Sequence, residues 1–181
     1  SSALILAPVV TYIGSAPVVV MERWGLGETQ FYHLFVPIIG GFMLSSWIGG
    51  RMAGRFPRDL QVKLGFALQA VATLLLWLLQ LLWPEQPLWP QQLLLCVMSF
   101  GTNMVLPILT IAILDLYPTA RGAASSMSSF MVFAGISLAM GVLAPLAEGH
   151  LDGIALLALA CGLVALGCWY SVHRRRYARR S

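Results

Sequence analysis

The sequence alternates long apolar segments with short loops, and nearly all of its basic residues lie in the loops of one side. The apolar segments cover residues 3–21, 31–47, 62–83, 93–114, 122–146 and 154–172. Each is long enough to cross about 30 Å of hydrocarbon at about 1.5 Å per residue. Of the 11 Lys and Arg residues, only Arg23 falls on the opposite side, and the others are Arg51, Arg55, Arg58, Lys63, Arg121, Arg174, Arg175, Arg176, Arg179 and Arg180. By the positive-inside rule the basic side is cytoplasmic, and an even number of crossings puts both chain ends there.

Composition excludes a water-soluble fold and leaves room for a single membrane domain. The chain is 59% hydrophobic and 10% charged, whereas soluble domains have about 25% charged residues. We therefore predict an all-α membrane protein, with six helices in residues 1–173 and a basic cytoplasmic tail in residues 174–181. The net charge of +4 is explained by orientation and anionic lipid rather than by nucleic acid, because the basic residues flank membrane spans.

Cysteine and histidine spacing indicates no metal site, cofactor or catalytic pair. The three cysteines lie within apolar spans, and the three histidines are scattered along the chain. The span interiors contain no histidine, so they offer no pair of nucleophile and base, and we predict no enzymatic activity. The chain opens without Met, and its first span shows neither a basic leader nor a cleavage site. We expect no signal peptide, and expect either part of a longer protein or a trimmed start.

The six spans differ in character, and the differences recur with a period of three. The first and fourth contain prolines and polar residues, the second and fifth are rich in small residues, and the third and sixth are the most uniformly apolar. This pattern predicts two three-helix repeats. In each repeat the first helix would line a pathway, the second would pack closely and the third would face lipid.

Polar residues along one face of the fourth span mark a candidate substrate pathway. Ser99, Asn103, Pro107 and Thr110 recur at spacings that place them on one helix face. On a pathway, Asn103 would contact substrate and Pro107 would give the helix a bend that can flex. Asn103 could equally join neighbouring helices, since hydrogen bonds between membrane helices are common.

Two other spans carry weaker polar patterns. Tyr12 and Ser15 precede Pro17 in the first span, and a kinked helix with polar atoms at mid-membrane depth is typical of transporter binding sites. A structural kink satisfied by neighbouring helices is the competing interpretation. The serines of the fifth span and the glutamines of the third favour helix packing over transport.

The loop after the second span carries a recognisable pattern of glycine and arginine. Residues 50–58 read Gly-Arg-Met-Ala-Gly-Arg-Phe-Pro-Arg. Through Gly50, Arg55 and Arg58 this loop resembles the Gly-x-x-x-Asp-Arg-x-Gly-Arg signature of the major facilitator superfamily. Gly54 and Pro57 depart from that signature, as is usual in the copy carried by the C-terminal half of these transporters.

The loop after the fourth span carries a second pattern. Residues 115–122 read Asp-Leu-Tyr-Pro-Thr-Ala-Arg-Gly. Through Asp115, Arg121 and Gly122 it resembles the superfamily's loop in which an Asp is followed by Pro and then by Arg-Gly. Residues 12–17, 22–26 and 120–126 are also similar to phrases of the Bcr/CflA-type drug-efflux antiporters.

The resemblance covers essentially the whole chain and implies helices seven to twelve of a twelve-helix protein. It implies a bacterial inner membrane, a missing N-terminal six-helix half as partner, and a central cavity between the halves. It also implies export of amphipathic compounds in exchange for protons by alternating access, without a cofactor. In this half we expect the cavity wall to contain Tyr12, Ser15, Asn103 and Pro107, with Phe130 and Phe133 as stacking surfaces for aromatic compounds.

The loop charges suggest a gate. Asp115 lies near the cytoplasmic end of the fourth span, where an unpaired carboxylate is costly. Arg51 or Arg55 could bind it bidentately. Such a pair would hold the cytoplasmic ends together in the outward-open state, whereas a solvated surface pair would be worth under about 1 kcal/mol.

Proton coupling and direction stay open at this stage. The spans contain no acid away from their ends, so the titrating carboxylate is expected in the missing half, and these six helices alone are not expected to transport. An importer of sugars or metabolites with the same fold is one alternative, although importers of hydrophilic solutes usually need more hydrogen-bonding side chains. A non-transporting membrane scaffold is another, against which the paired loop motifs argue.

Overall fold

The computed structural model describes residues 2–14, 16, 20–21, 28–52, 55–82, 88–138, 140–141, 164 and 167. Within these residues the regular secondary structure is entirely helical. Ser15 and the predicted tail 174–181 lie outside the described residues, and so does nearly all of the predicted span 154–172. The helices are α1 at Ser2–Gly14, α2 at Tyr32–Met52, α3 at Arg58–Leu82, α4 at Leu88–Leu116 and α5 at Arg121–Leu138, with a 3₁₀ turn, η2, at Glu28–Gln30.

Local sequence sets the helix ends on the basic side. The Pro57 carbonyl accepts the first hydrogen bonds of α3, from the backbone N–H groups of Leu60 and Gln61. A proline suits this place because it has no backbone N–H that would need a partner. Pro118 follows the end of α4 by two residues, where it cannot continue the helix. The α4 and α5 helices are consequently joined by a tight turn.

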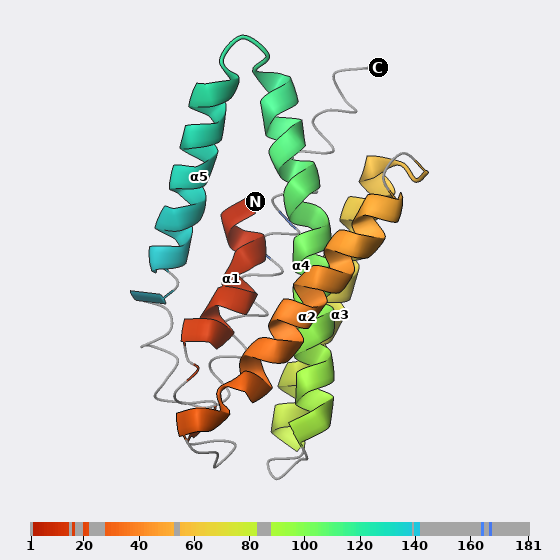
Figure 1. Ribbon diagram of the computed structural model, residues 1–181, viewed down its shortest axis with the longest axis vertical. Helices are drawn as coiled ribbons and strands as arrows, with labels where there is room; N and C mark the ends of the chain where they lie inside the picture. The colour runs from red at the N-terminus through yellow and green to blue at the C-terminus, as the bar shows by residue number, and fades with distance from the viewer. Residues whose placement is uncertain are drawn as a thin grey trace.

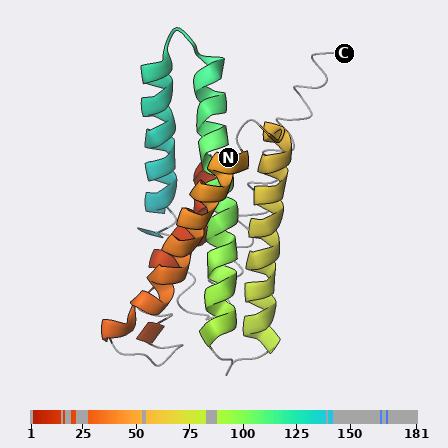
Figure 2. The ribbon, with the colours of Figure 1, turned by 45° about the vertical axis from the view of Figure 1, so that its right-hand side comes forward.

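The α4 helix lies at the centre of the described bundle, between α5 on one side and α3 on the other (Figures 1 and 2). Its most extensive contacts are with α2 and α3, and it also contacts α1 and α5. The α2 helix runs parallel to α4, whereas α3 and α5 run antiparallel to it (Figure 1). The ends of α2 and α4 and the starts of α3 and α5 therefore gather at one end of the bundle, with the described arginines there.

Three of the described helices are long and apolar enough to cross a membrane, and they indicate a membrane protein. They are α2, α3 and α4, with 21, 25 and 29 residues. The α1 helix is a shorter apolar helix that ends at Gly14 as described, before the end of the predicted span 3–21. The α5 helix ends at Leu138, whereas the sequence predicts a span over residues 122–146. Prediction of both spans rested on hydropathy, which does not locate helix ends.

Glycines allow α4 to approach two neighbours closely. A Cβ on Gly41 of α2 would collide with the Cys96 backbone carbonyl of α4. A Cβ on Gly101 of α4 would lie 2.6 Å from the Gly65 carbonyl oxygen and 2.9 Å from the Gln69 backbone nitrogen, both in α3. The close packing that the sequence predicts for small residues is thus seen in α2, and α3 and α4 share it.

The small residues of α5 behave differently from the prediction. No described residue of α5 is buried, and a Cβ on Gly122 would meet nothing within 4 Å. The reason is that, among the described helices, the main contacts of α5 are with α1 and α4, and they are far fewer than those of α4 with α2 or α3. Small size permits close helix approach, but here no described neighbour covers most of the helix surface.

Candidate functional site

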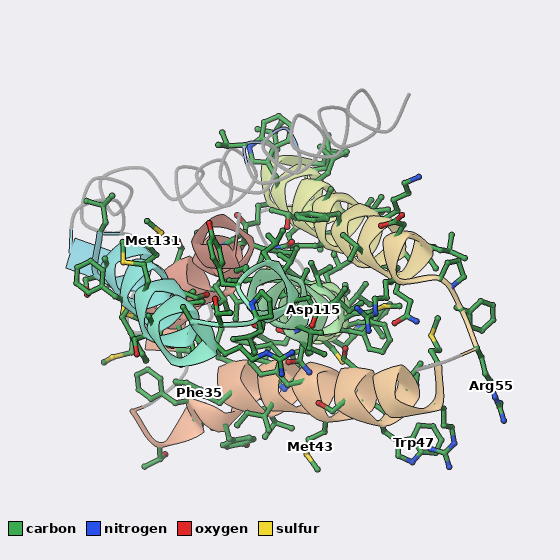
Figure 3. The ribbon with its side chains drawn as sticks, turned by 90° about the horizontal axis from the view of Figure 1, so that it is seen from above. Phe35, Met43, Trp47, Arg55, Asp115 and Met131 are labelled. Atoms are coloured by element: carbon green, nitrogen blue, oxygen red, sulfur yellow. The ribbon has the colours of Figure 1, made fainter. Side chains whose placement is uncertain are left out.

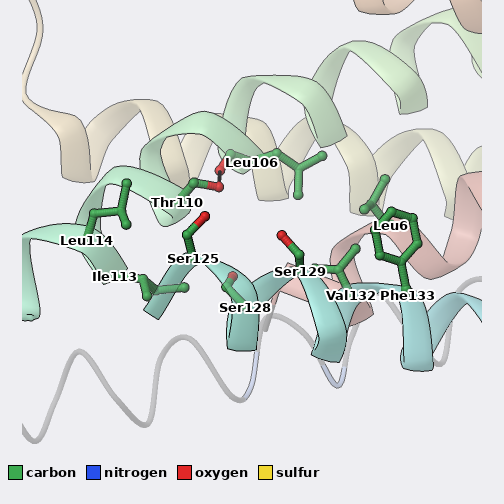
Figure 4. Close-up of a pocket in the computed structure, with 10 residues that line it drawn as sticks. All are labelled: Leu6, Leu106, Thr110, Ile113, Leu114, Ser125, Ser128, Ser129, Val132 and Phe133. Atoms are coloured by element: carbon green, nitrogen blue, oxygen red, sulfur yellow. Dashed lines mark hydrogen bonds between the residues drawn. The ribbon is translucent and has the colours of Figure 1, made fainter. Parts of the chain in front are cut away.

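A cavity lies where α1, α4 and α5 meet. Its volume is about 270 Å³, at the lower edge of the range for small-molecule sites. Figure 4 shows that α4 forms one wall and α5 the opposite wall. The lining residues are Leu6, Leu106, Thr110, Ile113, Leu114, Ser125, Ser128, Ser129, Val132 and Phe133.

The cavity combines an apolar frame with hydroxyl groups. Thr110 donates its hydroxyl hydrogen to the Leu106 carbonyl at 2.9 Å, which is the usual arrangement for a threonine within a helix. Ser125, Ser128 and Ser129 make no hydrogen bond with the described residues, and in Figure 4 the hydroxyls of Ser125 and Ser129 point toward α4. None of the lining residues is charged. The described part of this site therefore suits an uncharged or weakly polar part of a ligand.

Of the two phenylalanines predicted to stack on aromatic compounds, only one lines the cavity. Phe133 lines the cavity, whereas Phe130 does not, although both side chains are 67% exposed. Phe130 lies three residues earlier on α5 and is not among the residues that line the cavity. Pro107 is exposed and is likewise absent from the lining, although Leu106 before it contributes to the wall.

Asn103 joins α4 to α2. Its side-chain amide nitrogen donates to the Phe42 carbonyl at 3.0 Å and to the Ser46 hydroxyl oxygen at 2.9 Å. Ser46 donates in turn to the same Phe42 carbonyl at 2.9 Å. These bonds correspond to the interhelical alternative for Asn103, and the side chain lies outside the cavity lining.

Tyr12 lies in the packed core rather than on the cavity wall. Its side chain is 1% exposed and belongs to a cluster that includes Leu34 of α2 and Leu76 of α3. The Gln80 side-chain amide donates to the Tyr12 hydroxyl oxygen at 3.3 Å. The predicted place of Tyr12 on a cavity wall differs from this position, because the rotation of α1 turns the tyrosine toward α3.

The polar side chains of α3 connect it to α1. The Gln69 amide donates to the Ile5 backbone carbonyl at 2.7 Å, with Gln69 only 1% exposed. Ile5 lies in the turn before Pro8, and proline disturbs helix hydrogen bonding at such a turn. A neighbouring helix that supplies a donor there makes the proline tolerable in a membrane. The packing role predicted for these glutamines agrees with the contacts.

The two loop motifs meet at the basic end of the bundle. Arg58 Nη1 and Asp115 Oδ2 are 3.4 Å apart, and the side chains are 68% and 55% exposed. The predicted partners, Arg51 and Arg55, make no ion pair with Asp115 in the described residues. Arg51 instead stacks on the Trp47 ring, with its guanidinium carbon 3.6 Å from the ring centroid. The difference arises because Arg58 begins α3 directly beside the end of α4, whereas Arg51 lies on the far side of α2.

Both members of the pair occupy helix ends that disfavour their charge. Arg58 is the first residue of α3, and Asp115 is the penultimate residue of α4. Helix N-termini favour anions and C-termini favour cations, so each charge is opposed by the dipole of its own helix. Pairing offsets that opposition, and separation of the two helix ends removes the offset.

The remaining loop-motif residues have surface positions. Gly50 and Gly122 are exposed, and a Cβ added at either would meet nothing within 4 Å. Arg121 is exposed as the first residue of α5. The Ser126 hydroxyl donates to the Gly122 carbonyl at 3.0 Å, which closes the first turn of α5. Arg121 and Gly122 begin α5 directly after the turn that joins it to α4, whereas Gly50 lies near the end of α2.

Sequence reasoning missed most of the cavity lining. Ser125 lies in the phrase 120–126 and Ser128 close to it, but neither is predicted to line a cavity, and Leu6 and Ile113 look like ordinary membrane residues. The available signal is the run of serines in residues 125–129, opposite the exposed end of α4. In the described residues, no group of three or more His, Cys, Asp or Glu side chains could hold a metal ion.

Comparison with known proteins does not identify a relative. No protein-family model matches this chain, and neither the curated proteins nor the solved structures contain a match to it.

Proposed function

We propose that this chain is the C-terminal six-helix half of a proton-coupled multidrug efflux antiporter of the major facilitator superfamily, in a bacterial inner membrane. It works by alternating access together with an N-terminal half. The observation that carries the proposal is the cavity between α1, α4 and α5, with its apolar frame, its exposed Phe133 and serine hydroxyls that bond to none of the described residues. Such a lining fits part of an amphipathic compound better than it fits a sugar, which needs many hydrogen bonds.

The ion pair supports the alternating-access part of the proposal. Arg58 and Asp115 come from the two loops that resemble the superfamily motifs, and they connect the start of α3 to the end of α4. Because each charge is opposed by the dipole of its own helix, the attraction between them stabilises the protein most when the start of α3 and the end of α4 are close together. It would therefore favour the state in which the cytoplasmic ends are closed.

The test measures efflux from cells that express the intact gene product and are loaded with an amphipathic fluorescent dye. We expect efflux that stops when an ionophore collapses the proton gradient. Accumulation of sugars or organic acids instead would favour an importer, and the absence of any transport would favour a scaffold. Either result would contradict the proposal.

A matched pair of variants connects the efflux to the cavity. Phe133→Ala removes an aromatic ring from the lining, whereas Phe130→Ala removes an equally exposed ring from the same helix outside it. We expect Phe133→Ala to raise the KM for dye efflux about threefold to tenfold, as loss of aromatic contact does. Phe130→Ala should change it little. Equal effects of the two variants would show that the cavity is not the binding site.

A further inference from the structure

We propose that the buried side chain of Gln61 is a clamp that fixes the start of α3 to the end of α2 and thereby holds Arg58 beside Asp115. The clamp stands on the contacts at this end of the bundle, and only its consequence for alternating access rests on the proposed function. Gln61 is then a positioning residue for the ion pair, and it lies three residues beyond the motif at residues 50–58.

Gln61 is buried at an end of the bundle that is otherwise exposed. The three residues before it in α3 are Arg58, Asp59 and Leu60, and all of them are exposed. Gln61 itself is only 6% exposed. Withdrawing a side-chain amide from water is costly unless the amide is hydrogen-bonded. The burial of Gln61 therefore points to partners that its amide binds.

Those partners are two backbone carbonyls, one in α2 and one in the loop that follows it. The Gln61 amide nitrogen donates to the Met52 carbonyl at 3.3 Å and to the Phe56 carbonyl at 3.2 Å. Met52 is the last residue of α2, where carbonyls have no partner within the helix. The backbone N–H groups of Arg55 and Phe56 donate to the same Met52 carbonyl at 3.1 and 3.3 Å. The end of α2, the loop and the start of α3 thus meet at one carbonyl.

The α2 and α3 helices have little else to hold them to each other. Among the described helices, each packs extensively on α4, and the two hardly contact one another. In Figure 3, Asp115 near the end of α4 lies between α2 and α3, and Arg55 marks the loop that joins them at the edge of the bundle. The hydrogen bond from Gln61 to Met52 is therefore a direct tie between two helices that otherwise meet through α4.

The tie reaches the ion pair through the first turn of α3. Arg58 begins that turn and Gln61 follows three residues later, so the two are neighbours on the helix surface. The exposed pair of Arg58 and Asp115 attracts too weakly to position a helix end by itself. The α2 helix packs closely on α4 at Gly41, and Gln61 extends that fixed placement to the start of α3. Arg58 is thereby kept within reach of Asp115.

In the proposed transporter the clamp decides which segments move together. The end of α2 and the start of α3 would move as one piece when the cytoplasmic ends separate, because Gln61 joins them. The contact that opens would be the one between this piece and the end of α4, where Arg58 meets Asp115.

The first experiment measures how firmly the end of α2 is held to the start of α3. Spin labels are attached at Gly50→Cys and Lys63→Cys, both at exposed positions, in the purified intact protein with its native cysteines replaced. Pulsed electron spin resonance should show one narrow distance distribution. Gln61→Met keeps a side chain of similar length but has no hydrogen-bond donor, and it should broaden the distribution about twofold because the local opening becomes easier. An unchanged width would overturn the proposal.

The matched control is Gln69→Met, in a second buried glutamine of the same helix. The Gln69 amide donates to the Ile5 carbonyl of α1 rather than to α2, so this variant also removes a buried interhelical hydrogen bond from α3. The distance distribution between the two labels should stay narrow. Equal broadening in Gln69→Met and Gln61→Met would mean that any loosening of α3 has the same effect, and would overturn the proposal.

A second experiment tests whether Gln61 acts through the ion pair. Labels at Lys63→Cys and Tyr117→Cys report the separation of the start of α3 from the end of α4. Asp115→Asn and Gln61→Met should each broaden this distribution, and the double variant should be no broader than either one. Additive broadening would overturn the positioning role. No effect of Asp115→Asn alone would count against the gate in the proposed function, while the first experiment still decides whether the clamp exists.

Discussion

The α4 helix has two very different sides. Toward α3 its backbone approaches so closely that Gly65 and Gly101 face each other with no room for a side chain. Toward α5 it leaves a cavity of about 270 Å³, and no described residue of α5 is buried. The comparison indicates that α2 and α3 pack tightly against α4 around Cys96 and Gly101, whereas α5 packs loosely against α4 and can shift more easily.

The largest expected effect on stability tests the side of α4 that packs against α3. Gly101→Ala places a methyl group against the backbone of α3, whose atoms cannot move independently. We expect the free energy of unfolding to fall by about 1 to 3 kcal/mol, the usual range for overpacking. Denaturant titration of the protein in detergent would measure this. The control is Gly40→Ala in α2, where a Cβ meets nothing within 4 Å, and a similar loss there would remove the contrast.

The next effect concerns the hydrogen bonds between α4 and α2. Asn103→Leu removes the hydrogen bonds to the Phe42 carbonyl and the Ser46 hydroxyl. Interhelical hydrogen bonds in membranes are worth about 0.6 to 2 kcal/mol, so the free energy of unfolding should fall by about 1 kcal/mol. The same titration measures it, and Ser46→Ala should cost less because Asn103 keeps the carbonyl. A loss of transport without any loss of stability would instead assign Asn103 to substrate binding.

On the side of α4 that faces α5, a larger side chain should raise the free energy of unfolding instead of lowering it. Ser128→Leu extends an apolar side chain into the cavity between α4 and α5. Filling a cavity commonly stabilises a protein, and we expect a gain of about 0.5 kcal/mol in the free energy of unfolding together with a loss of dye efflux. If the variant instead lost as much stability as Gly101→Ala, the two sides of α4 would be equally tight and the comparison would fail.

The smallest effect on stability is expected at the ion pair. Asp115→Asn or Arg58→Gln should change the free energy of unfolding by no more than about 0.3 kcal/mol, at the low end for exposed pairs, because both side chains are more than half exposed. Each should nevertheless increase maleimide labelling of a cysteine introduced on the cytoplasmic side, while Arg55→Gln should not. Unchanged labelling in the first two variants would argue against a gate.

A charge exchange sharpens this last prediction. In the double variant Arg58→Asp with Asp115→Arg, each charge lies at the helix end that its dipole favours. The exchanged pair should restore normal labelling, with stability equal to or slightly above that of the unchanged protein. Failure to restore labelling would indicate that the individual residues matter rather than their attraction.

Individual residues show how far local reasoning reaches. The sequence predicts all five described helices from their apolar length, and for four of them the predicted end on the basic side lies within four residues of the observed one. It also predicts a polar face at Asn103 but does not choose between substrate and a neighbouring helix. That choice depends on the rotation of α4 relative to α2, which no local pattern specifies.

The ion pair and the cavity illustrate the same limit. Asp115 could be recognised from the sequence as a charge that needs a partner. Three arginines of the motif at residues 50–58 could supply that partner, namely Arg51, Arg55 and Arg58. Only the position of the start of α3 beside the end of α4 selects Arg58. Phe130 and Phe133 look equivalent in sequence, and only the angle at which α5 meets α4 places Phe133 in the cavity lining.

The sequence by itself determined that this chain is built from apolar helices and that its basic loops share one side, because hydrophobic length and charge are properties of single segments. The tertiary structure decided which polar groups meet, where helices touch closely and where a cavity remains. Those outcomes depend on the rotation, register and crossing of whole helices, and a change of about 100° in rotation, one residue along a helix, would select different partners throughout.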